Sequence, residues 1–573
     1  MTSADPPALR VPVGEDADRW ASRATSRRVL LVVHNVTAAG RLLDVLPLFH
    51  DDFRVQLLVT STGSSAFQGG IRELFADLEL PVLPWEQALA TPVDLAISAS
   101  FGGQLHGLRG KLTVLSHGVG YTKRLANQTK PNQTGQGGAG ADGEPTFGLS
   151  PEWLLVDGEP FVDGLVLSHP EQLERLRRAC PAAEAASVLA GDPCFDRMLA
   201  AEPHRERFRR ALGVRRGQRL VVLNSTWNPE GFFGSGGDQD VLPGLLPRLA
   251  AELPADDYRL AAVLHPNIWY GHGPGQIRVW LDRALRGGLT LVDPLHAWRQ
   301  ALLAADAVVG DFGAVSYYAA ALGTPVLLAA AARDRLDPRA PVAAFVRDAP
   351  RLDPHGPLRD QVERLLARHR PAAGPAEFTS SAPGASAALL RRHFYALMDL
   401  PEPAAPALLE GLPLPRYDPP RRTAPLNVRT RVSGADVWIE RTTGHPYGAD
   451  GEAHLAVHED TRDPGDLTRA DVIVREGPPD DPRLGGAEGW TAEVLRRYPG
   501  CALAAYVTGP DRCVVRARGR DGVLRLSAVA DADADPAAYA SSLYAWQAGG
   551  VSVPTTLRVH AASGVHVVRV VRG

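Results

Sequence analysis

The sequence ADAVVGDFGAVSYYAAALGTP, residues 305–325, decides the fold class of this chain. A short apolar run at 307–310 predicts a buried strand, and Asp311 follows it directly. Residues 314–322 predict a helix, and a second apolar run begins at Pro325. Strand, helix and strand in this order are typical of a parallel α/β sheet, whose ligands bind beyond the carboxyl ends of the strands.

The same alternation continues on both sides of this stretch and predicts an α/β protein with two Rossmann-like domains. We place the first domain at residues 28–200 and the second at 201–400, closed by a helix at 385–398. The predicted strands are residues 28–34, 53–60, 93–98, 112–116, 164–167 and 188–190 in the first domain, and 219–223, 259–264, 289–292, 307–310 and 325–329 in the second.

The remaining segments differ in composition from these two domains. Residues 1–27 are polar and rich in Pro, Asp and Ala, which predicts a disordered tail and no secretory signal. Residues 401–428 carry many prolines and predict a linker. Residues 429–573 alternate short strand-like runs with helices near 491–497 and 537–546. They predict a small α+β appendage whose role the sequence does not indicate.

Composition limits the function classes. A chain of 573 residues is too long for one core. The net charge of -4 gives no basic field, so broad nucleic-acid binding is not expected. No run of apolar residues is long enough for a transmembrane segment. The four scattered cysteines show no zinc spacing and fit a reducing cytoplasm.

Two histidines follow predicted strands, and we predict both as catalytic. His117 stands between a buried strand and Gly118, where an imidazole can act as general base on a hydroxyl. His265 precedes Pro266, which fixes the local backbone, and a donor histidine there can stabilise charge on a phosphoryl oxygen. The ordinary alternatives are a histidine that satisfies a loop carbonyl and one that caps a helix.

Short polar residues at strand ends of the second domain predict a binding site for a phosphate or nucleotide, which would be the donor of a transfer reaction. Ser225 and Thr226 end its first strand, Trp227 follows them, and Asn267 follows the His-Pro pair. Their hydroxyl and amide groups can bind a phosphate or nucleotide. Trp227 is open to two interpretations, stacking on a base or packing in the core.

The helix that starts near residue 314 is a second predicted part of the donor site. Helix N-termini attract phosphate, Gly313 allows a close approach, and Ser316 adds a hydroxyl one turn later. Asp311 is assigned to the same donor site, with N-capping of the helix as its alternative role.

Lys123 and Asp196 are predicted contacts to the acceptor or to a phosphate. The chain contains only three lysines, Lys111, Lys123 and Lys130, and all lie near His117. A compact ammonium suits a phosphate, whereas compositional bias is the plain alternative. Asp196 follows the turn 191–193 in the first turn of a predicted helix, where simple turn chemistry is the alternative.

Common nucleotide and hydrolase signatures are missing from the sequence. It has no G-x-x-x-x-G-K-[ST], no G-x-G-x-x-G after a strand, no H-E-x-x-H and no G-x-S-x-G. ATP hydrolysis, nicotinamide chemistry and serine hydrolysis are therefore disfavoured. No cluster of ligand residues demands a metal, and we expect no metal and no cofactor.

Taken in order, the motifs resemble those of the CDP-glycerol glycerophosphotransferase family of wall teichoic acid enzymes. The similar stretches are HGVGYTK at 117–123, GDPCFD at 191–196, NSTWN at 224–228, the His265-Pro266 pair and GDFGAVSYYAAALGTP at 310–325. The resemblance implies a GT-B architecture over roughly residues 29–398. It assigns His117 as the base for an acceptor hydroxyl, His265 to the donor diphosphate, and Asp311 with its helix to the donor phosphates. It also implies a cytoplasmic enzyme of cell-envelope polymer synthesis with a lipid-linked or glycan acceptor, and so leaves open peripheral contact at the inner membrane face.

Several positions depart from the family pattern. Gly313 and Ala314 replace paired serines, Asn228 replaces an arginine, and Cys194 replaces another. These changes leave the donor open. We expect a transferase that moves a glycerophosphate-like or glycosyl group from a nucleotide-activated donor to an acceptor hydroxyl. The alternatives are a nucleotide-sugar glycosyltransferase or sugar 2-epimerase, and a binding or scaffold protein whose site has decayed.

Overall fold

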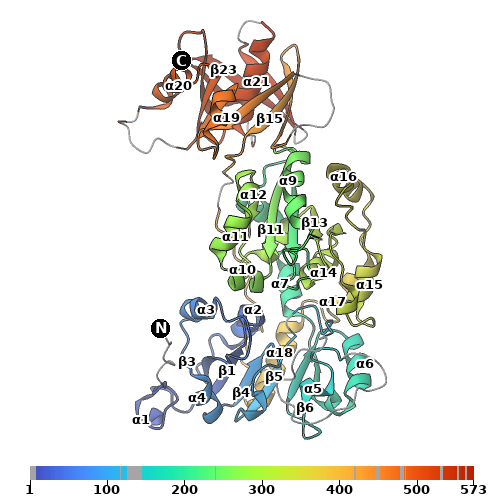
Figure 1. The fold of residues 1–573 in the computed structure, drawn as a ribbon. Helices are drawn as coiled ribbons and strands as arrows, with labels where there is room; N and C mark the ends of the chain where they lie inside the picture. Colours follow the sequence, from blue (N-terminus) through green and yellow to red (C-terminus); the bar gives the residue numbers. More distant parts are fainter. Residues whose placement is uncertain are drawn as a thin grey trace.

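The computed structural model describes residues 8–573 except 117, 125–144, 239, 418–420, 445–451, 478–482, 484, 530–532, 534, 551–553 and 562–563. The chain forms three bodies in a row (Figure 1): a first α/β lobe, a second α/β lobe and a C-terminal barrel. The two-lobe part of the predicted fold class is confirmed by the sheets described below.

The first lobe contains a parallel sheet in the order β3-β2-β1-β4-β5-β8-β9. Its central strand β1 (Arg27–Val33) is a nearly unbroken apolar run, as expected for a strand covered on both faces. Val29 of β1 lies in register with Leu57 and Leu95 on either side. The other strands are β2 (Val55–Ser61), β3 (Val82–Leu83), β4 (Leu95–Ser98), β5 (Lys111–Val114), β8 (Gly164–Leu167) and β9 (Ser187–Leu189).

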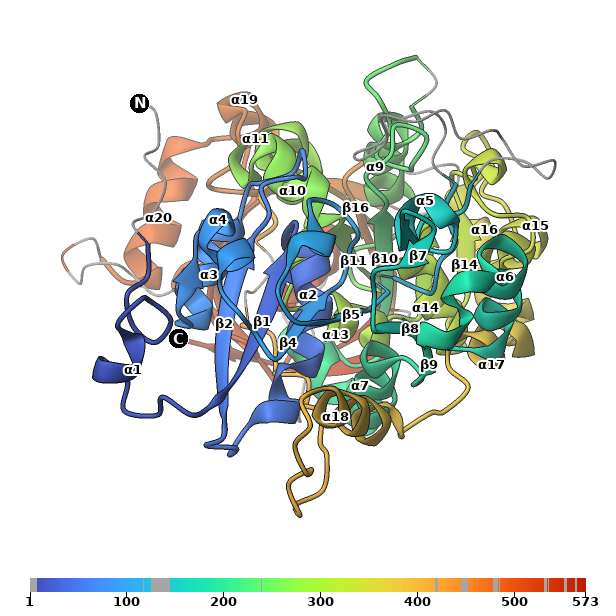
Figure 2. The ribbon, with the colours of Figure 1, turned by 90° about the horizontal axis from the view of Figure 1, so that it is seen from below.

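Helices flank this first sheet (Figure 2). They are α2 (Val36–Val45), α3 (Ile71–Leu78), α4 (Trp85–Ala90), α5 (Pro151–Leu154) and α6 (Pro170–Ala179), with a small hairpin of β6 (Leu155–Val156) and β7 (Glu159–Pro160). The segment before the sheet differs from the predicted disordered tail over its described part. It contains α1 (Ala17–Trp20), Val13 is buried in the lobe's core, and the backbone of Leu9 hydrogen-bonds Gln87.

The second lobe repeats the design with a parallel sheet in the order β12-β11-β10-β13-β14. Its strands are β10 (Arg219–Ser225), β11 (Tyr258–Leu264), β12 (Thr290–Leu291), β13 (Ala307–Gly310) and β14 (Val326–Leu328). Its helices are α8 (Arg205–Ala211), α9 (Leu242–Glu252), α10 (Pro266–His272), α11 (Pro274–Trp280), α12 (Asp282–Arg286), α13 (Trp298–Ala304), α14 (Ala314–Ala321), α15 (Pro341–Asp348), α16 (Leu358–Arg368) and α17 (Ala373–Thr379).

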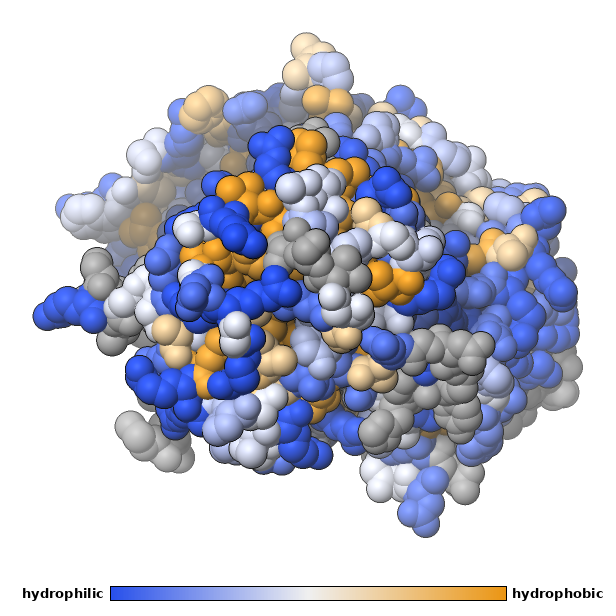
Figure 3. Space-filling view, turned by 90° about the horizontal axis from the view of Figure 1, so that it is seen from above, coloured by the Kyte–Doolittle hydropathy of each residue, from blue (hydrophilic) through white to orange (hydrophobic). Residues whose placement is uncertain are grey.

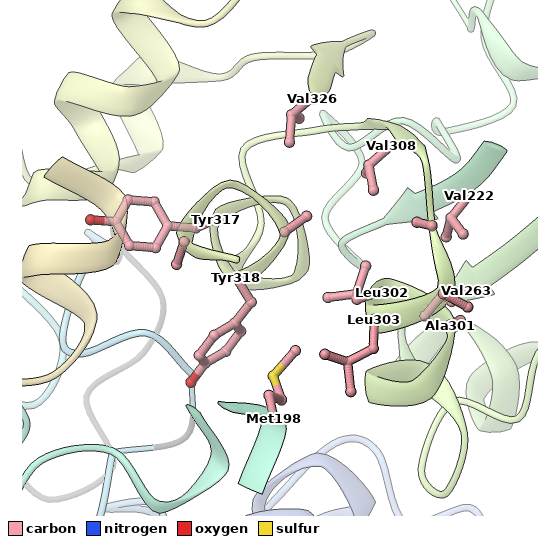
Figure 4. Packing of buried hydrophobic residues seen from close by; sticks show 14 of the residues in the cluster. Met198, Val222, Val263, Ala301, Leu302, Leu303, Val308, Tyr317, Tyr318 and Val326 are labelled. Carbon is pink, nitrogen blue, oxygen red and sulfur yellow. The ribbon is translucent and has the colours of Figure 1, made fainter. Parts of the chain in front are cut away.

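Two helices cross between the lobes. Helix α7 (Pro193–Ala201) follows the first sheet but packs Met198 into the core of the second lobe, beside Leu303 and Tyr318 (Figure 4). Helix α18 (Ser386–Leu397) follows the second lobe but packs Phe394 into the core under β1. The predicted helix at 385–398 therefore exists, but it closes the first lobe and not the second.

The C-terminal body is a closed barrel of nine strands, which the sequence analysis described only as an α+β appendage. The order around it is β15-β16-β22-β23-β21-β20-β19-β18-β17, closed by β17 on β15. The strands are β15 (Leu426–Ser433), β16 (Asp436–Thr442), β17 (Glu452–His458), β18 (Val472–Glu476), β19 (Leu503–Gly509), β20 (Arg512–Ala517), β21 (Leu524–Ala528), β22 (Thr556–Ala561) and β23 (Gly564–Arg572).

Helix α21 (Pro536–Ala548) fills the barrel. It contacts β15, β16 and β18–β22, and residues on every side of it are buried. A helix that is apolar or small all round is one buried on all sides, which explains its Ala-Ser-rich sequence. Helices α19 (Pro464–Arg469) and α20 (Ala487–Arg497) lie outside the strands. Figure 3 shows hydrophobic residues separated by hydrophilic ones at this end of the molecule.

No helix in the described ranges combines the length and apolar composition needed to cross a bilayer.

Candidate functional site

A cavity of about 430 Å³ lies between the two α/β lobes. The first lobe lines it with loops that follow β1, β4 and β5, and the second lobe lines it with loops that follow β10, β11 and β13. Both parallel sheets therefore point their carboxyl ends at one space, which is where ligands of such sheets bind. Its volume suits a small organic ligand.

The predicted base, His117, lies outside the described residues, and its role stays a prediction. Its neighbours Ser116 and Gly118 both line the cavity. Gly120, three residues later, has a φ of +62°, and a Cβ there would lie 2.4 Å from the amide nitrogen of Gln172. Gln172 is itself fixed by hydrogen bonds to Ser168. The backbone of this segment therefore requires glycine at 120.

His265 lines the cavity at the end of β11. Its Nδ1 accepts a hydrogen bond from the backbone N–H of Asn267 at 3.1 Å, so the side chain caps α10. Because Nδ1 accepts, the neutral ring carries its proton on Nε2, which makes Nε2 a donor. The ring of His265 can therefore cap α10 through Nδ1 and still donate a hydrogen bond to a ligand through Nε2, as its predicted catalytic role requires. Asn267 also lines the cavity, and its Oδ1 accepts from Thr37 of the first lobe at 3.4 Å.

Lys123 brings an ammonium from the first lobe to the wall formed by the second. Its Nζ donates to Thr226 Oγ1 at 3.3 Å and to Asn228 Oδ1 at 3.4 Å, and its backbone pairs with Leu336. Burial lowers the pKa of Lys123, and the nearby Asp311 carboxylate opposes that shift. Lys123 and Thr226 both line the cavity, so these two predicted phosphate ligands lie side by side.

Asp311 does not line the cavity, contrary to its predicted direct contact with donor phosphates. It is fully buried, and its carboxylate accepts from the backbone N–H groups of Thr226, Phe232 and Gly313 at 2.8 to 2.9 Å. Burial raises the pKa of Asp311, and these amide donors oppose the increase. The residue therefore positions the loops that follow β10 and β13, and does not itself face a ligand.

Ser225 and Ser316 take part in the same buried framework. Ser225 lines the cavity, and its hydroxyl donates to the carbonyl of Thr226 at 2.8 Å and accepts from the N–H of Phe233 at 2.8 Å. Ser316 is fully buried behind the wall, where its hydroxyl donates to Asn224 Oδ1 at 3.1 Å. The predicted direct contact of Ser316 with the donor is therefore not supported by its position.

The N-terminus of α14 opens on the cavity. Gly313 and Ala314 line it, and Gly313 at the N-cap makes no side-chain capping hydrogen bond. A Cβ on Gly313 would lie 3.1 Å from Thr226 Cβ and 3.0 Å from Asp311 Oδ1. The glycine thus allows Thr226 to pack against the helix start. The first N–H groups of a helix have no partner within the helix and attract anions, although the N–H of Gly313 is already bound to Asp311.

Asp196 lies away from the cavity, which corrects its predicted contact with acceptor or phosphate. Its carboxylate accepts from the N–H groups of Gly384 and Ser386 at 2.8 and 3.0 Å. These two residues precede and begin α18. Asp196 on α7 therefore caps the other crossing helix and joins the two crossovers.

Trp227 stands at the edge of the cavity, with 37% of its surface exposed. Its ring meets Phe67 of the first lobe edge-on, with the ring centroids 5.1 Å apart. It is therefore not a core residue. A half-exposed ring at this edge can contact a flat ligand, and that function remains a prediction.

The base of the cavity holds a charge network that the sequence analysis missed. Arg41 of α2 donates to the hydroxyl of Tyr318 at 2.7 Å, and that hydroxyl donates to Asp192 at 2.5 Å. Asp44, one turn after Arg41, accepts from Arg299 at 2.8 Å and from Arg197 at 2.5 Å. Arg41, Arg299 and Tyr318 also line the cavity.

One feature of the sequence indicates that buried charges are present here. Residues 36–45 read VTAAGRLLDV, a helix in which Arg41 and Asp44 interrupt apolar residues on a face that would otherwise be buried. Buried charges occur in pairs, so partners on other elements follow from that pattern. Their identity required the tertiary structure, because Arg197, Arg299 and Tyr318 lie more than 150 residues away along the chain.

No protein-family model matches this chain, and no curated protein sequence matches it. Three similar solved structures are the wall teichoic acid polymerase TagF, the UDP-GlcNAc 2-epimerase of Methanocaldococcus jannaschii in complex with UDP-GlcNAc and UDP, and Anabaena Alr3699/HepE in complex with UDP. Their sequence identities are 14%, 12% and 13%, and the TM-scores are 0.43, 0.41 and 0.33. The matches cover 65%, 64% and 65% of this chain and 88%, 99% and 100% of the others. Because these TM-scores lie below 0.5, the assignment of two facing Rossmann-like lobes rests on the strand orders and the shared cavity.

Proposed function

We propose that the chain is a GT-B-type transferase that binds a nucleotide-activated donor between its two lobes. It would move a glycosyl or glycerophosphate-like group from that donor to an acceptor hydroxyl. The observation that carries this proposal is the cavity into which both parallel sheets open, with the Lys123 ammonium, the Thr226 hydroxyl and the start of α14 on one wall. A cation, a hydroxyl and exposed helix N–H groups are the donors that a diphosphate needs.

Each side chain has a defined task in this proposal. Lys123 and the first turn of α14 hold the donor diphosphate, and His265 donates its Nε2 proton to a phosphoryl oxygen. His117 accepts the proton of the acceptor hydroxyl, whose oxygen then attacks the transferred centre. The bond from that centre to a phosphate oxygen breaks, and the electron pair leaves with the nucleotide. Attack on a sugar carbon releases the nucleoside diphosphate, and attack on the β-phosphorus of a CDP-polyol releases CMP.

The departures in the motifs leave the nature of the donor open. Gly313 and Ala314 bring no hydroxyls to the start of α14, the N–H of Gly313 is already bound to Asp311, and Asn228 supplies an amide. The ammonium that contacts Asn228 belongs to Lys123 of the opposite lobe. The wall therefore keeps one positive charge close to Thr226, as a diphosphate requires, but it does not select between a sugar and a polyol. A sugar 2-epimerase would use the same donor site without an acceptor.

Calorimetric titration with CDP, UDP and GDP tests the proposal. We expect one of the three to bind between the lobes, and Lys123→Met to weaken the binding at that site by about 10- to 100-fold through loss of a charge-assisted hydrogen bond. Lys111→Met is the matched control, because Lys111 is exposed and, among the described residues, forms a salt bridge with Asp163 alone. Incubation with CDP-glycerol and with UDP-sugars then shows which donor is consumed and whether an epimer forms. Absence of binding by all three nucleotides would favour the scaffold alternative and reject the enzyme.

A further inference from the structure

A second cavity, of about 860 Å³, lies between the second lobe and the barrel. Its wall is formed by α8, residues 213–218, the linker around Arg422, the ends of β18 and β19, and the start of α21. It shares no lining residue with the cavity between the lobes. Its volume is within the range of small-molecule sites.

Arginine dominates the charge of this second cavity. Six arginines line it, whereas the carboxylates that line it are four: Arg205, Arg209, Arg210, Arg215, Arg216 and Arg422 against Glu206, Glu476, Asp533 and Asp535. Arg205 and Arg209 are engaged by Asp306 and Glu206. Asp535 is engaged by Arg441 at 2.7 Å, and it lies 3.8 Å from Arg215.

Three arginine side chains of this wall form no salt bridge to a carboxylate among the described residues. They are those of Arg210 on α8, Arg216 in the following loop and Arg422 in the linker. Arg210 and Arg216 are exposed, and within the described residues Arg216 bonds to a carboxylate through its backbone N–H alone, to Asp533 at 2.6 Å. Three guanidinium groups on one concave surface make an electropositive site.

Arg422 shows most directly that positive charge is in excess here. One Nη donates to the carbonyl of Ala255 at 3.1 Å, and its buried Nε has no hydrogen-bond partner within the described part of the chain. Burial lowers the pKa of Arg422 to about 10. The nearby Arg215 and Arg441 contribute to that decrease, and Asp535 and Asp256 oppose it. An anion bound beside Arg422 would oppose the repulsion by the two neighbouring arginines.

Glu476 also lines this cavity, but its side chain carries only part of a negative charge near neutral pH. Burial, with a smaller contribution from Asp535, raises the pKa of Glu476 to about 7, against the effect of Arg215, Arg422 and Arg441. Near neutral pH a large fraction of Glu476 is therefore uncharged. The wall also presents Tyr417, Val214 and Val507, which provide apolar surface beside the arginines.

We propose that this junction cavity binds a phosphorylated small molecule of nucleotide size, with its phosphates on Arg210, Arg216 and Arg422. Planar guanidinium groups recognise phosphate oxygens in pairs, which suits a ligand with more than one phosphate. The ring of Tyr417 and the adjacent valines would contact the organic part of the ligand. The proposal does not depend on the reaction at the cavity between the lobes, since the two cavities share no residue.

Calorimetric titration of the full chain with pyrophosphate and with ATP tests this proposal. We expect both to bind, ATP more tightly, and Arg210→Ala with Arg216→Ala to weaken binding tenfold or more. Both side chains are exposed, so the double variant should fold normally. Arg207→Ala is the matched control, because Arg207 is exposed on the same helix but does not line the cavity.

The variant Lys123→Met separates the two cavities. It should leave pyrophosphate binding at the junction unchanged while it weakens nucleotide binding between the lobes. Absence of pyrophosphate binding, or equal affinity in the wild type and the double arginine variant, would overturn the junction site without affecting the proposed transferase. Loss of pyrophosphate binding in Lys123→Met alone would place the anion between the lobes and would also overturn it.

Discussion

The cavity between the lobes and the cavity at the barrel junction are built by opposite means. The first keeps one ammonium on a wall supported from behind by Asp311, whose carboxylate is paired with three backbone N–H groups. The second collects six arginines, and three of their side chains form no salt bridge to a carboxylate in the described ranges. Loops held by such buried hydrogen bonds keep their geometry before a ligand arrives. Exposed arginines attract anions but do not hold them in one fixed position, which suits ligand binding more than catalysis.

The largest expected effect is that of removing the carboxylate of Asp311, which holds the loops that follow β10 and β13. Asp311→Ala leaves the three buried amide donors of Thr226, Phe232 and Gly313 without their acceptor. We expect a loss of about 3 kcal/mol or more in the stability of the second lobe, together with loss of nucleotide binding. Thermal unfolding measures the first and calorimetry the second. Asp348→Ala, at an exposed carboxylate, is the control and should change neither. Unchanged stability in Asp311→Ala would show that the framework does not depend on this side chain.

The next effect concerns the attachment of the barrel. Arg441 is 1% exposed and donates to Asp256 of the second lobe at 2.6 and 2.8 Å. Asp256→Ala leaves a buried arginine with Asp535 as its remaining carboxylate, and we expect a loss of about 2 to 4 kcal/mol. Limited proteolysis should then release the barrel at lower protease concentration than in the wild type. An unchanged digestion pattern would mean that other contacts hold the barrel in place.

A smaller loss of stability is expected from the charge network of Arg41, Tyr318 and Asp192 at the first cavity, and the neighbouring Tyr317 provides a control. Tyr318→Phe removes the hydroxyl that links Arg41 to Asp192, and we expect a loss of about 1 to 2 kcal/mol in thermal unfolding. Tyr317→Phe is the control, because the neighbouring hydroxyl of Tyr317 has no hydrogen-bond partner among the described residues. Equal effects of the two substitutions would contradict the network as described.

The smallest expected effect is a pH dependence at the junction. The pKa of Glu476 rises from 4.5 to about 7 on folding, so the folded state holds this proton more tightly than the unfolded state does. Its stabilising contribution is complete below about pH 4.5 and is lost as the pH rises through about 7. Glu476→Gln should therefore flatten the pH dependence and stabilise the protein at pH 8 by about 1 kcal/mol, after allowance for solvent screening. Parallel pH profiles of the thermal midpoint in wild type and variant would contradict this assignment.

Periodicity in the sequence was enough to predict both parallel sheets. Buried strands such as β11 and β13 are largely apolar runs, and His265 and Asp311 follow them directly. The crossing of α7 and α18 was not predictable in this way, because an amphipathic helix does not reveal which lobe covers its apolar face. The barrel was only partly predicted, since the small residues of β19 and α21 give no clear period.

The site was predicted to the level of the cavity but not of each contact. Lys123, Thr226, His265 and Asn267 line it as expected from their places at loop and strand ends. Asp311 and Asp196 do not line it, and the sequence could not indicate this, because an acidic residue at a helix start serves equally to hold backbone amides or to face a ligand. That choice depends on burial, which only the three-dimensional structure gives.

A crystal structure of the chain with bound CDP or UDP would show directly whether the nucleotide binds between the two lobes. We expect the diphosphate there, within hydrogen-bond distance of Lys123 Nζ and the first turn of α14, with His265 close to a phosphoryl oxygen. A nucleotide bound only at the barrel junction, or an empty cavity between the lobes at saturating nucleotide, would contradict it.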